Sequence, residues 1–218
     1  MKALIPKYAV LPLALAFAVN CAAYFGARLF LGNTSYHHMT LPVDSIIPFV
    51  PAFIVVYLLA YVQWAVGYIM ICRDSRQVCY YVMGAEIIAK CICFLCFVFY
   101  PTTMVRAEIT GSSLFETAVR YLYEIDAPNN LFPSIHCLES YFCMRGSFIS
   151  KKLSGWYRMI MILAAILVFA STVLLKQHVV ADMAGAIITA EFALWFARKT
   201  HIDQWFAKIN FLERRPPQ

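Results

Sequence analysis

Apolar runs of roughly twenty residues recur along almost the whole chain, and they restrict its possible folds more than any other feature. A helix of about 20 apolar residues is long enough to cross the hydrocarbon core of a bilayer. Six stretches have this character, and they cover residues 8–30, 49–71, 78–100, 133–150, 157–175 and 178–197. The sequence therefore predicts an all-α membrane protein with six transmembrane helices, forming one domain over residues 1–218.

The composition agrees with this class. Of the 218 residues, 62% are hydrophobic and 14% are charged, whereas a soluble domain carries about 25% charged residues. The net charge of +6 is explained by lysines and arginines gathered on one membrane face. We therefore expect membrane lipids as partners, and no nucleic acid.

The distribution of lysine and arginine predicts the orientation. The N-terminus, the connections after the second and fourth spans, and the tail hold twelve of them, whereas the opposite connections hold four: Arg28, Arg106, Arg120 and Lys176. Cytoplasmic loops carry the excess of positive charge. Both termini are thus expected in the cytoplasm, with the protein in a bacterial plasma membrane. The first run is too long for the apolar region of a signal peptide, so we interpret it as a retained span.

The one long polar segment, 101–130, is predicted to contain a short helix. Between residues 114 and 125, the apolar residues and the charged residues each follow helical spacing. This pattern is typical of an amphipathic helix that lies in the membrane interface.

The stretch 171–182, STVLLKQHVVAD, collects polar side chains where the fifth span ends and the sixth begins. His178 and Asp182 are four residues apart, so on a helix they share one face. A carboxylate can hold one imidazole nitrogen and leave the other aimed outward, which makes histidine a base or a nucleophile. The alternative is that Asp182 merely satisfies a polar histidine at a helix end, and for an isolated pair this alternative is the commoner one.

Other spans bring polar residues to the same membrane face. Arg106 follows the outer end of the third span, and His136 lies in the first turn of the fourth. Ionisable groups at membrane depth are costly and mark functional sites. The topology therefore predicts one outward-facing active site.

These groups predict phosphate ester chemistry on a lipid. His178, held by Asp182, would attack phosphorus, and His136 would protonate the leaving lipid alkoxide. The phosphate would be held by cations, a hydroxyl group and helix-start amides, from Arg106, Ser134, Ser171 and Lys176. No cofactor is expected, and a metal site made of both histidines and Asp182 is a less favoured alternative.

Deeper in the spans, two further polar features stand out. Glu86 and Lys90 are four apart in the third span and are expected to neutralise each other. Glu139 lies one turn below His136 and is a candidate for lining the pocket, or for bonding a neighbouring span.

Three short motifs resemble those of the type 2 phosphatidic acid phosphatase superfamily. Pro-Ser-Ile-His at 133–136 looks like its Pro-Ser-Gly-His motif. Ser171, His178 and Asp182 have the spacing of its Ser-Arg-x5-His-x3-Asp motif, and Arg106 stands where its Lys-x6-Arg-Pro motif has arginine. The resemblance extends from the third span to the sixth. It implies a six-helix fold, a phosphohistidine on His178 and chemistry that needs no metal.

The departures from these motifs concern the phosphate-binding cations. Phe99, Ala107, Ile135 and Thr172 replace a lysine, a proline, a glycine and an arginine, and Lys176 is a candidate to restore one cation. The pattern is similar to the branch that contains inositol phosphorylceramide synthases. We expect a membrane lipid phosphatase acting on a lipid phosphate or diphosphate ester. The alternatives are a phosphotransferase that moves a phospho-alcohol headgroup between lipids, and a non-catalytic binder of anionic lipids. The sequence does not predict the oligomeric state.

Overall fold

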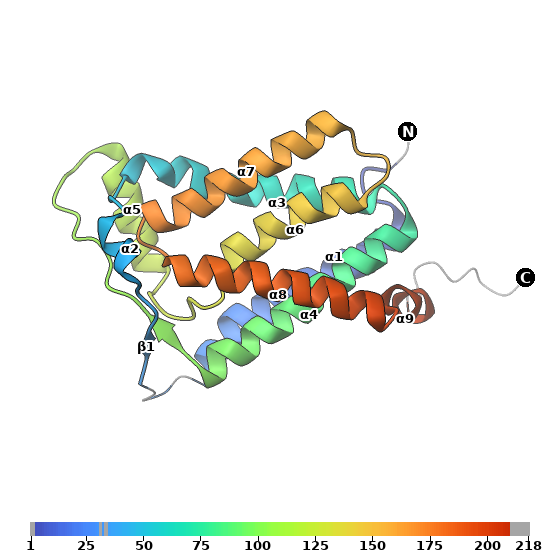
Figure 1. The fold of residues 1–218 in the computed structure, drawn as a ribbon, viewed down its shortest axis with the longest axis horizontal. Helices are drawn as coiled ribbons and strands as arrows, with labels where there is room; N and C mark the ends of the chain where they lie inside the picture. The colour runs from blue at the N-terminus through green and yellow to red at the C-terminus, as the bar shows by residue number, and fades with distance from the viewer. Residues whose placement is uncertain (1–2, 31, 33–34, 210–218) are drawn as a thin grey trace, which may run out of the picture.

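The computed structural model is a bundle of long helices, and it describes residues 3–30, 32 and 35–209 (Figure 1). The long helices are α1 (Lys7–Cys21), α3 (Ile54–Cys72), α4 (Arg76–Phe99), α6 (Ile135–Ile149), α7 (Gly155–Leu174) and α8 (Val180–Lys199). The shorter helices are η1 (Ala22–Gly26), α2 (Pro42–Ile46), η2 (Pro51–Phe53), α5 (Leu114–Ile125) and α9 (Ile202–Ile209). Two short parallel strands, β1 (His37–His38) and β2 (Thr102–Thr103), pair beside the bundle.

Five helical segments in the described part of the chain are long and apolar enough to cross a membrane. They are Lys7–Gly26, Pro51–Cys72, Arg76–Phe99, Gly155–Leu174 and Val180–Lys199. The prediction of an all-α membrane protein is thereby confirmed in its general form. The helix at the predicted fourth span is the exception, because α6 has only 15 residues and a length of about 22 Å.

Helix α6 is short because Ser134 caps its first turn, so the helix begins two residues later than the predicted span. It packs against α3, α7 and α8. At two positions α3 and α6 come very close: a Cβ on Gly67 would meet Sγ of Cys143 at 2.6 Å, and one on Gly146 would meet Ile71 at 2.4 Å. Small residues therefore allow α6 to pack inside the bundle.

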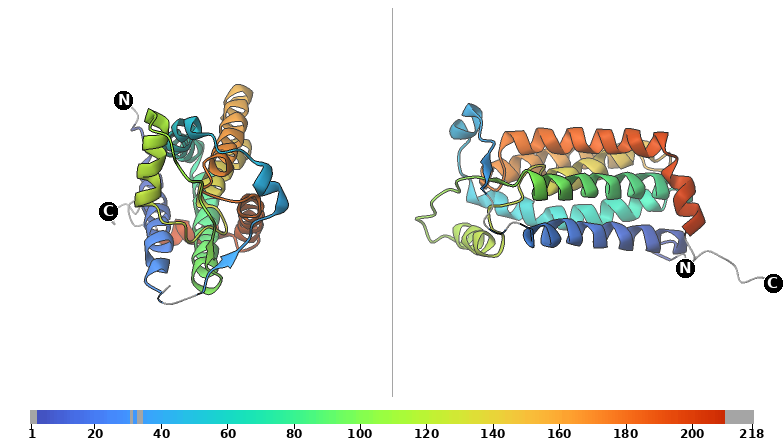
Figure 2. Two further views of the ribbon diagram at one scale, coloured as in Figure 1. Left: turned by 90° about the vertical axis from the view of Figure 1, so that its left-hand side faces the viewer. Right: turned by 90° about the horizontal axis from the view of Figure 1, so that it is seen from below.

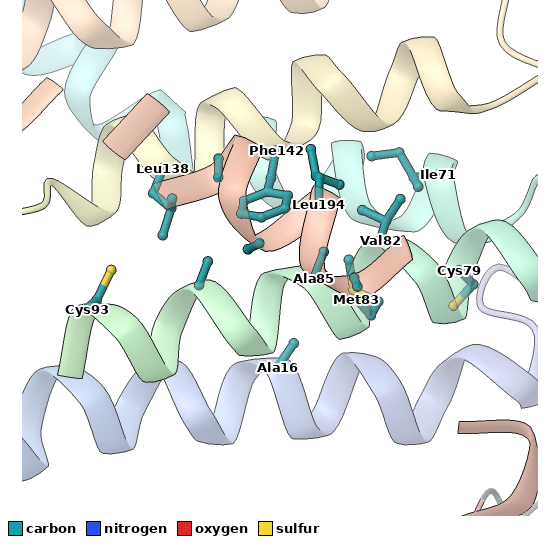
Figure 3. Close-up of a cluster of buried hydrophobic side chains, with 14 of the residues drawn as sticks. Ala16, Ile71, Cys79, Val82, Met83, Ala85, Cys93, Leu138, Phe142 and Leu194 are labelled. Carbon is teal, nitrogen blue, oxygen red and sulfur yellow. The ribbon is translucent and has the colours of Figure 1, made fainter. Parts of the chain in front are cut away.

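The centre of the bundle is an apolar cluster between α4, α6 and α8, shown in Figure 3. On α8 the buried face carries small residues at helical spacing: Ala186, Ala190, Ala193 and Ala197. Because lipid is as apolar as these side chains, close helix contact stabilises such a core more than removal from water does.

The two ends of the bundle differ. Helices α2 and α5 lie at one end, and α9 lies at the other, near the start of α1 (Figure 2). The first end also receives the start of α6 and the α7–α8 turn. The predicted helix at 114–125 is present as α5, with Ser113 and Glu116 forming its capping box. Its place in a membrane interface stays a prediction.

Candidate active site

His178 and Asp182 make the contact that their spacing predicts. Nδ1 of His178 lies 3.1 Å from Oδ2 of Asp182. The same oxygen accepts a hydrogen bond of 3.1 Å from the backbone N–H of Val179, so one carboxylate caps α8 and holds the imidazole. The turn before it is closed by Lys176, whose φ is 51°.

The ring of His136 lies close to that of His178. Their centroids are 6.4 Å apart and the ring planes are inclined by 50°. His136 stacks on Tyr57 at 4.1 Å between centroids, and its Nδ1 lies 3.3 Å from the Tyr57 hydroxyl. Tyr61 and Trp64 meet the ring edge-on. Among the residues that the structure describes, Nε2 of His136 has no hydrogen-bond partner, so this nitrogen is available to a ligand.

A backbone contact joins the two helices that carry the histidines. The N–H of Ser134 donates to the carbonyl of Asp182 at 3.2 Å, and Oγ of Ser134 accepts from the N–H of Cys137. Ser134 is fully buried. It therefore holds the starts of α6 and α8 together, which explains why residues 42 positions apart in sequence form one site.

Arg106 reaches the site from the loop before α5. Its guanidinium donates to the carbonyl of Tyr123 at 2.9 Å, to the carbonyl of Asp126, and to Oε1 of Gln177 at 2.6 Å. It also lies over the Tyr123 ring. Burial lowers the pKa of Arg106 from its ordinary value, but a guanidinium stays protonated in proteins. Arg106 thus keeps its charge, and its hydrogen bond fixes the side chain of Gln177, the residue before His178.

Lys176 and Ser171 are close to the site, but the hydrogen bonds of both side chains go to backbone carbonyls. The ammonium of Lys176 donates to the carbonyls of Asp44 and Ile47, at 2.9 and 2.6 Å. The hydroxyl of Ser171 is fully buried and donates to the carbonyl of Val168 at 2.7 Å. Ser171 therefore has no free donor, and Lys176 has two of its three ammonium hydrogens directed to carbonyls.

His178 lies between two cavities. The first, which we call the cation cavity, has a volume of about 310 Å³ and is lined by Arg106, Lys176, Asp44 and Met104 among others. The second, the aromatic cavity, has a volume of about 410 Å³ and is lined by His136, Tyr24, Tyr61, Trp64, Asn130 and Gln177 among others. Both histidines line the aromatic cavity, so a ligand there can contact both rings.

Two amide groups in the aromatic cavity were missed by the sequence reasoning. Nε2 of Gln177 and Nδ2 of Asn130 are buried and have no hydrogen-bond partner in the described part of the chain. Because Oε1 of Gln177 accepts from Arg106, the amide is oriented with its NH2 group directed away from the guanidinium. These two groups are donors that an anionic ligand can use.

The aromatic residues around His136 were missed as well, although the sequence holds a signal for them. Tyr57, Tyr61 and Trp64 follow each other at intervals of four and three, so they share one face of α3. Such a stripe in an apolar span is indistinguishable from ordinary packing residues without the partner ring.

No three His, Cys, Asp or Glu side chains within residues 3–30, 32 and 35–209 are grouped so that they could hold a metal ion. Comparison of the chain with family models, curated proteins and solved structures gives no match.

Proposed function

We propose that the protein is an integral membrane lipid phosphatase that cleaves a lipid phosphate or diphosphate ester through a phosphohistidine on His178. The observation that carries this proposal is the 6.4 Å separation of the His136 and His178 rings. Two imidazoles beside one ligand provide a nucleophile and a general acid, which are the groups that a two-step phosphoryl transfer needs.

In the first step, Nε2 of His178 attacks phosphorus. Because Nδ1 faces Asp182, it carries the proton and leaves the lone pair on Nε2. The bond between phosphorus and the lipid oxygen breaks as the phosphorus–nitrogen bond forms. His136 gives its proton to the leaving lipid alkoxide through Nε2.

In the second step, His136 accepts a proton from water, and the resulting hydroxide attacks the phosphohistidine. The phosphorus–nitrogen bond breaks, inorganic phosphate leaves, and His178 returns to its starting state. Asp182 stabilises the protonated imidazole whenever positive charge develops on His178.

The negative charge of the phosphoryl group is held chiefly by amide donors. The NH2 groups of Gln177 and Asn130 lie in the aromatic cavity, beside both histidines. Arg106 acts through Gln177. Its guanidinium donates to Oε1 of Gln177 at 2.6 Å, which orients the amide, and it adds a positive charge to the site. This arrangement accounts for a site that lacks two cations of the superfamily motifs.

In the membrane, we place α6 as a short fourth span and α5 in the outer interface. The burial of α6 among α3, α7 and α8 supports this placement, since its polar residues then face protein instead of lipid. The site lies at the end of the bundle opposite to α9 and the start of α1. With twelve lysines and arginines toward the termini and four toward the site, the site faces outward.

A second candidate function is transfer of the phosphoryl or phospho-alcohol group to a lipid alcohol. The aromatic cavity favours it, because about 410 Å³ beside His136 leaves room for an acceptor larger than water. His136 would then activate the acceptor hydroxyl.

The test is to trap the intermediate. Purified protein in detergent is mixed with a lipid phosphate labelled with ³²P, then quenched in alkali, where phosphohistidine survives. We expect label on His178 in the wild type and none in His178→Ala. Release of labelled inorganic phosphate identifies a phosphatase, and label in a second lipid identifies a transferase. Absence of a labelled protein with every lipid phosphate tried would contradict both, and would favour an anionic-lipid binder.

A further inference from the structure

A third cavity lies next to the aromatic cavity, deeper in the bundle. This carboxylate cavity has a volume of about 360 Å³ and is lined by Asn20, Tyr68, Glu86 and Glu139, together with apolar side chains. It shares Phe17, Asn20, Tyr61 and Trp64 with the aromatic cavity. The two spaces therefore adjoin along α1 and α3, and one ligand can extend from the histidines into the carboxylate cavity.

Two carboxylates, Glu86 and Glu139, line this cavity, and Lys90 contacts both of them. Nζ of Lys90 lies 2.5 Å from Oε1 of Glu139 and 3.7 Å from Oε1 of Glu86, so its closer partner is not the one expected from sequence spacing. The Tyr68 hydroxyl donates to Oε2 of Glu139. All three charged residues are at most 6% exposed. Charged groups at this depth are costly to insert, which makes a functional role the default hypothesis.

The cavity contains hydrogen-bond acceptors without donors. Oε2 of Glu86 is buried and has no hydrogen-bond partner among the residues described, and the same holds for Oδ1 of Asn20. The cluster also has two carboxylates for one ammonium; Nζ of Lys90 has no hydrogen bond of good geometry among the described residues either, but Lys90 does not line this cavity. An acyl chain cannot satisfy such acceptors, whereas a hydroxyl or an amine can.

We propose that the carboxylate cavity recognises a hydrogen-bond donor, a hydroxyl or a protonated amine, on the lipid backbone near the phosphate ester. This inference rests on the proposed function, because it places the donor relative to a phosphoryl group at His178. Asn20 lines both the aromatic cavity and the carboxylate cavity, and His136 and Glu139, which line one each, are three residues apart on α6, about 4.5 Å along the helix axis. The lipid donor is therefore only a few bonds away from the ester oxygen, as in a vicinal diol or amino alcohol.

Within the cluster, Glu86 differs from Glu139 in a way that makes a clean test possible. Glu139 is held by both Lys90 and Tyr68, so its removal would disturb α3, α4 and α6. Oε2 of Glu86 has no such contact. In Glu86→Gln, the amide oxygen faces Lys90 and the NH2 group faces the cavity, where it repels a ligand donor.

The experiment measures binding without turnover, using the full chain in detergent and unphosphorylated ligands. The probes are a long-chain vicinal diol, a vicinal amino alcohol and a plain alcohol of equal chain length, with affinity taken from thermal unfolding at increasing ligand. We expect the wild type to bind the diol or the amino alcohol at least about tenfold tighter than the plain alcohol. A preference for the amine over the diol identifies charge as the recognised property, and equal binding identifies hydrogen bonding.

Variants then identify the residues responsible for the ligand preference. Glu86→Gln is expected to abolish the preference, and Asn20→Ala to weaken it. Glu191→Gln is the matched control, because Glu191 pairs with Arg145 away from the cavity, and it is expected to keep the preference. Equal wild-type binding of all three ligands overturns the inference even if a variant fails to fold. An unchanged preference in folded Glu86→Gln overturns it as well.

The outcome is separable from that of the proposed function. His178→Ala is expected to retain the preference, because His178 takes no part in binding the donor. Formation of a phosphohistidine without any ligand preference removes only this inference. A ligand preference without a phosphohistidine removes the phosphatase and leaves the recognition of the lipid backbone in place.

Discussion

The cation cavity and the aromatic cavity share His178 and differ in how their polar groups are satisfied. In the cation cavity, the charged groups of Lys176 and Arg106 donate most of their hydrogens to carbonyls or to Gln177, although Nε of Arg106 is buried without a partner among the described residues. In the aromatic cavity, polar atoms of His136, Gln177 and Asn130 are buried without partners among the described residues. Buried polar groups in native proteins are nearly always paired. The aromatic cavity has more unpartnered polar atoms than the cation cavity and is therefore the better candidate site for a polar ligand.

This difference assigns separate roles to the two sides of His178. The paired donors of the cation cavity would have to leave carbonyls or Gln177 before they could bind phosphate, so we expect charge there chiefly to orient the turn and to supply a field. In the aromatic cavity, the NH2 group of Gln177 is oriented through Arg106 and has no partner among the described residues, which is the condition for stabilising charge without reorganisation. The predictions below test this division, beginning with the residue that both cavities share.

Replacing His178, which lines both cavities, is expected to have the largest effect on turnover. His178→Ala removes the proposed nucleophile, so phosphate release should fall by about 10⁴-fold or more. The measurement is release of labelled phosphate from a lipid phosphate in detergent. Glu191→Gln serves as the control for general damage to the bundle. Activity within about tenfold of wild type in His178→Ala would remove the histidine from the chemistry.

The next effect concerns the amide donor of the aromatic cavity. Gln177→Leu keeps the volume of the side chain and removes the NH2 group, so kcat should fall by about 10²-fold. Arg106→Lys should lower kcat in the same direction, because a lysine does not reproduce the hydrogen bonds that orient Gln177. In the double variant the two losses should not add, since Arg106 acts through Gln177. Fully additive losses would show that Arg106 contacts the phosphoryl group itself.

Much of the fold could be predicted from the sequence, because it follows from local patterns. The apolar run at 78–100 became α4, and the helical spacing at 114–125 gave the bounds of α5. The first helix ends sooner than expected, at Arg28, and the predicted 133–150 span is a shorter helix that starts after the Ser134 cap. Hydrophobicity alone locates the spans, but caps and packing decide where each helix ends.

The same distinction between local and long-range interactions applies to the candidate site. The contact between His178 and Asp182 is local, so spacing was sufficient to predict it. The approach of His136 followed from the predicted topology, in which both histidines begin spans at the same membrane face. The contacts of Gln177 with Arg106, and of Lys176 with the carbonyl of Asp44, join segments that are 71 and 132 residues apart, and no local pattern specifies them.

A smaller effect on kcat is expected from Tyr57, whose ring stacks on that of His136. Tyr57→Phe keeps the stacked ring and removes only the hydroxyl that lies 3.3 Å from Nδ1. A hydrogen bond of this kind contributes about 0.5–1.5 kcal/mol, so kcat should fall by about three- to tenfold. Tyr61→Phe is the matched control, because Tyr61 meets the same ring by its edge, and it should change kcat less. Equal losses in both variants would indicate a general effect of the aromatic wall.

The smallest effect on turnover is expected in the cation cavity, at Lys176. Lys176→Met removes two charge-assisted hydrogen bonds to the carbonyls of Asp44 and Ile47, so the free energy of unfolding should fall by about 1–3 kcal/mol. Because the ammonium is directed to these carbonyls, KM for a lipid phosphate should change by only about twofold or less. Thermal unfolding and steady-state kinetics on the same preparation measure both quantities. A large rise in KM with unchanged stability would instead show that Lys176 leaves the backbone to bind phosphate, as the sequence alone suggests, and the two cavities would then share the ligand's charge.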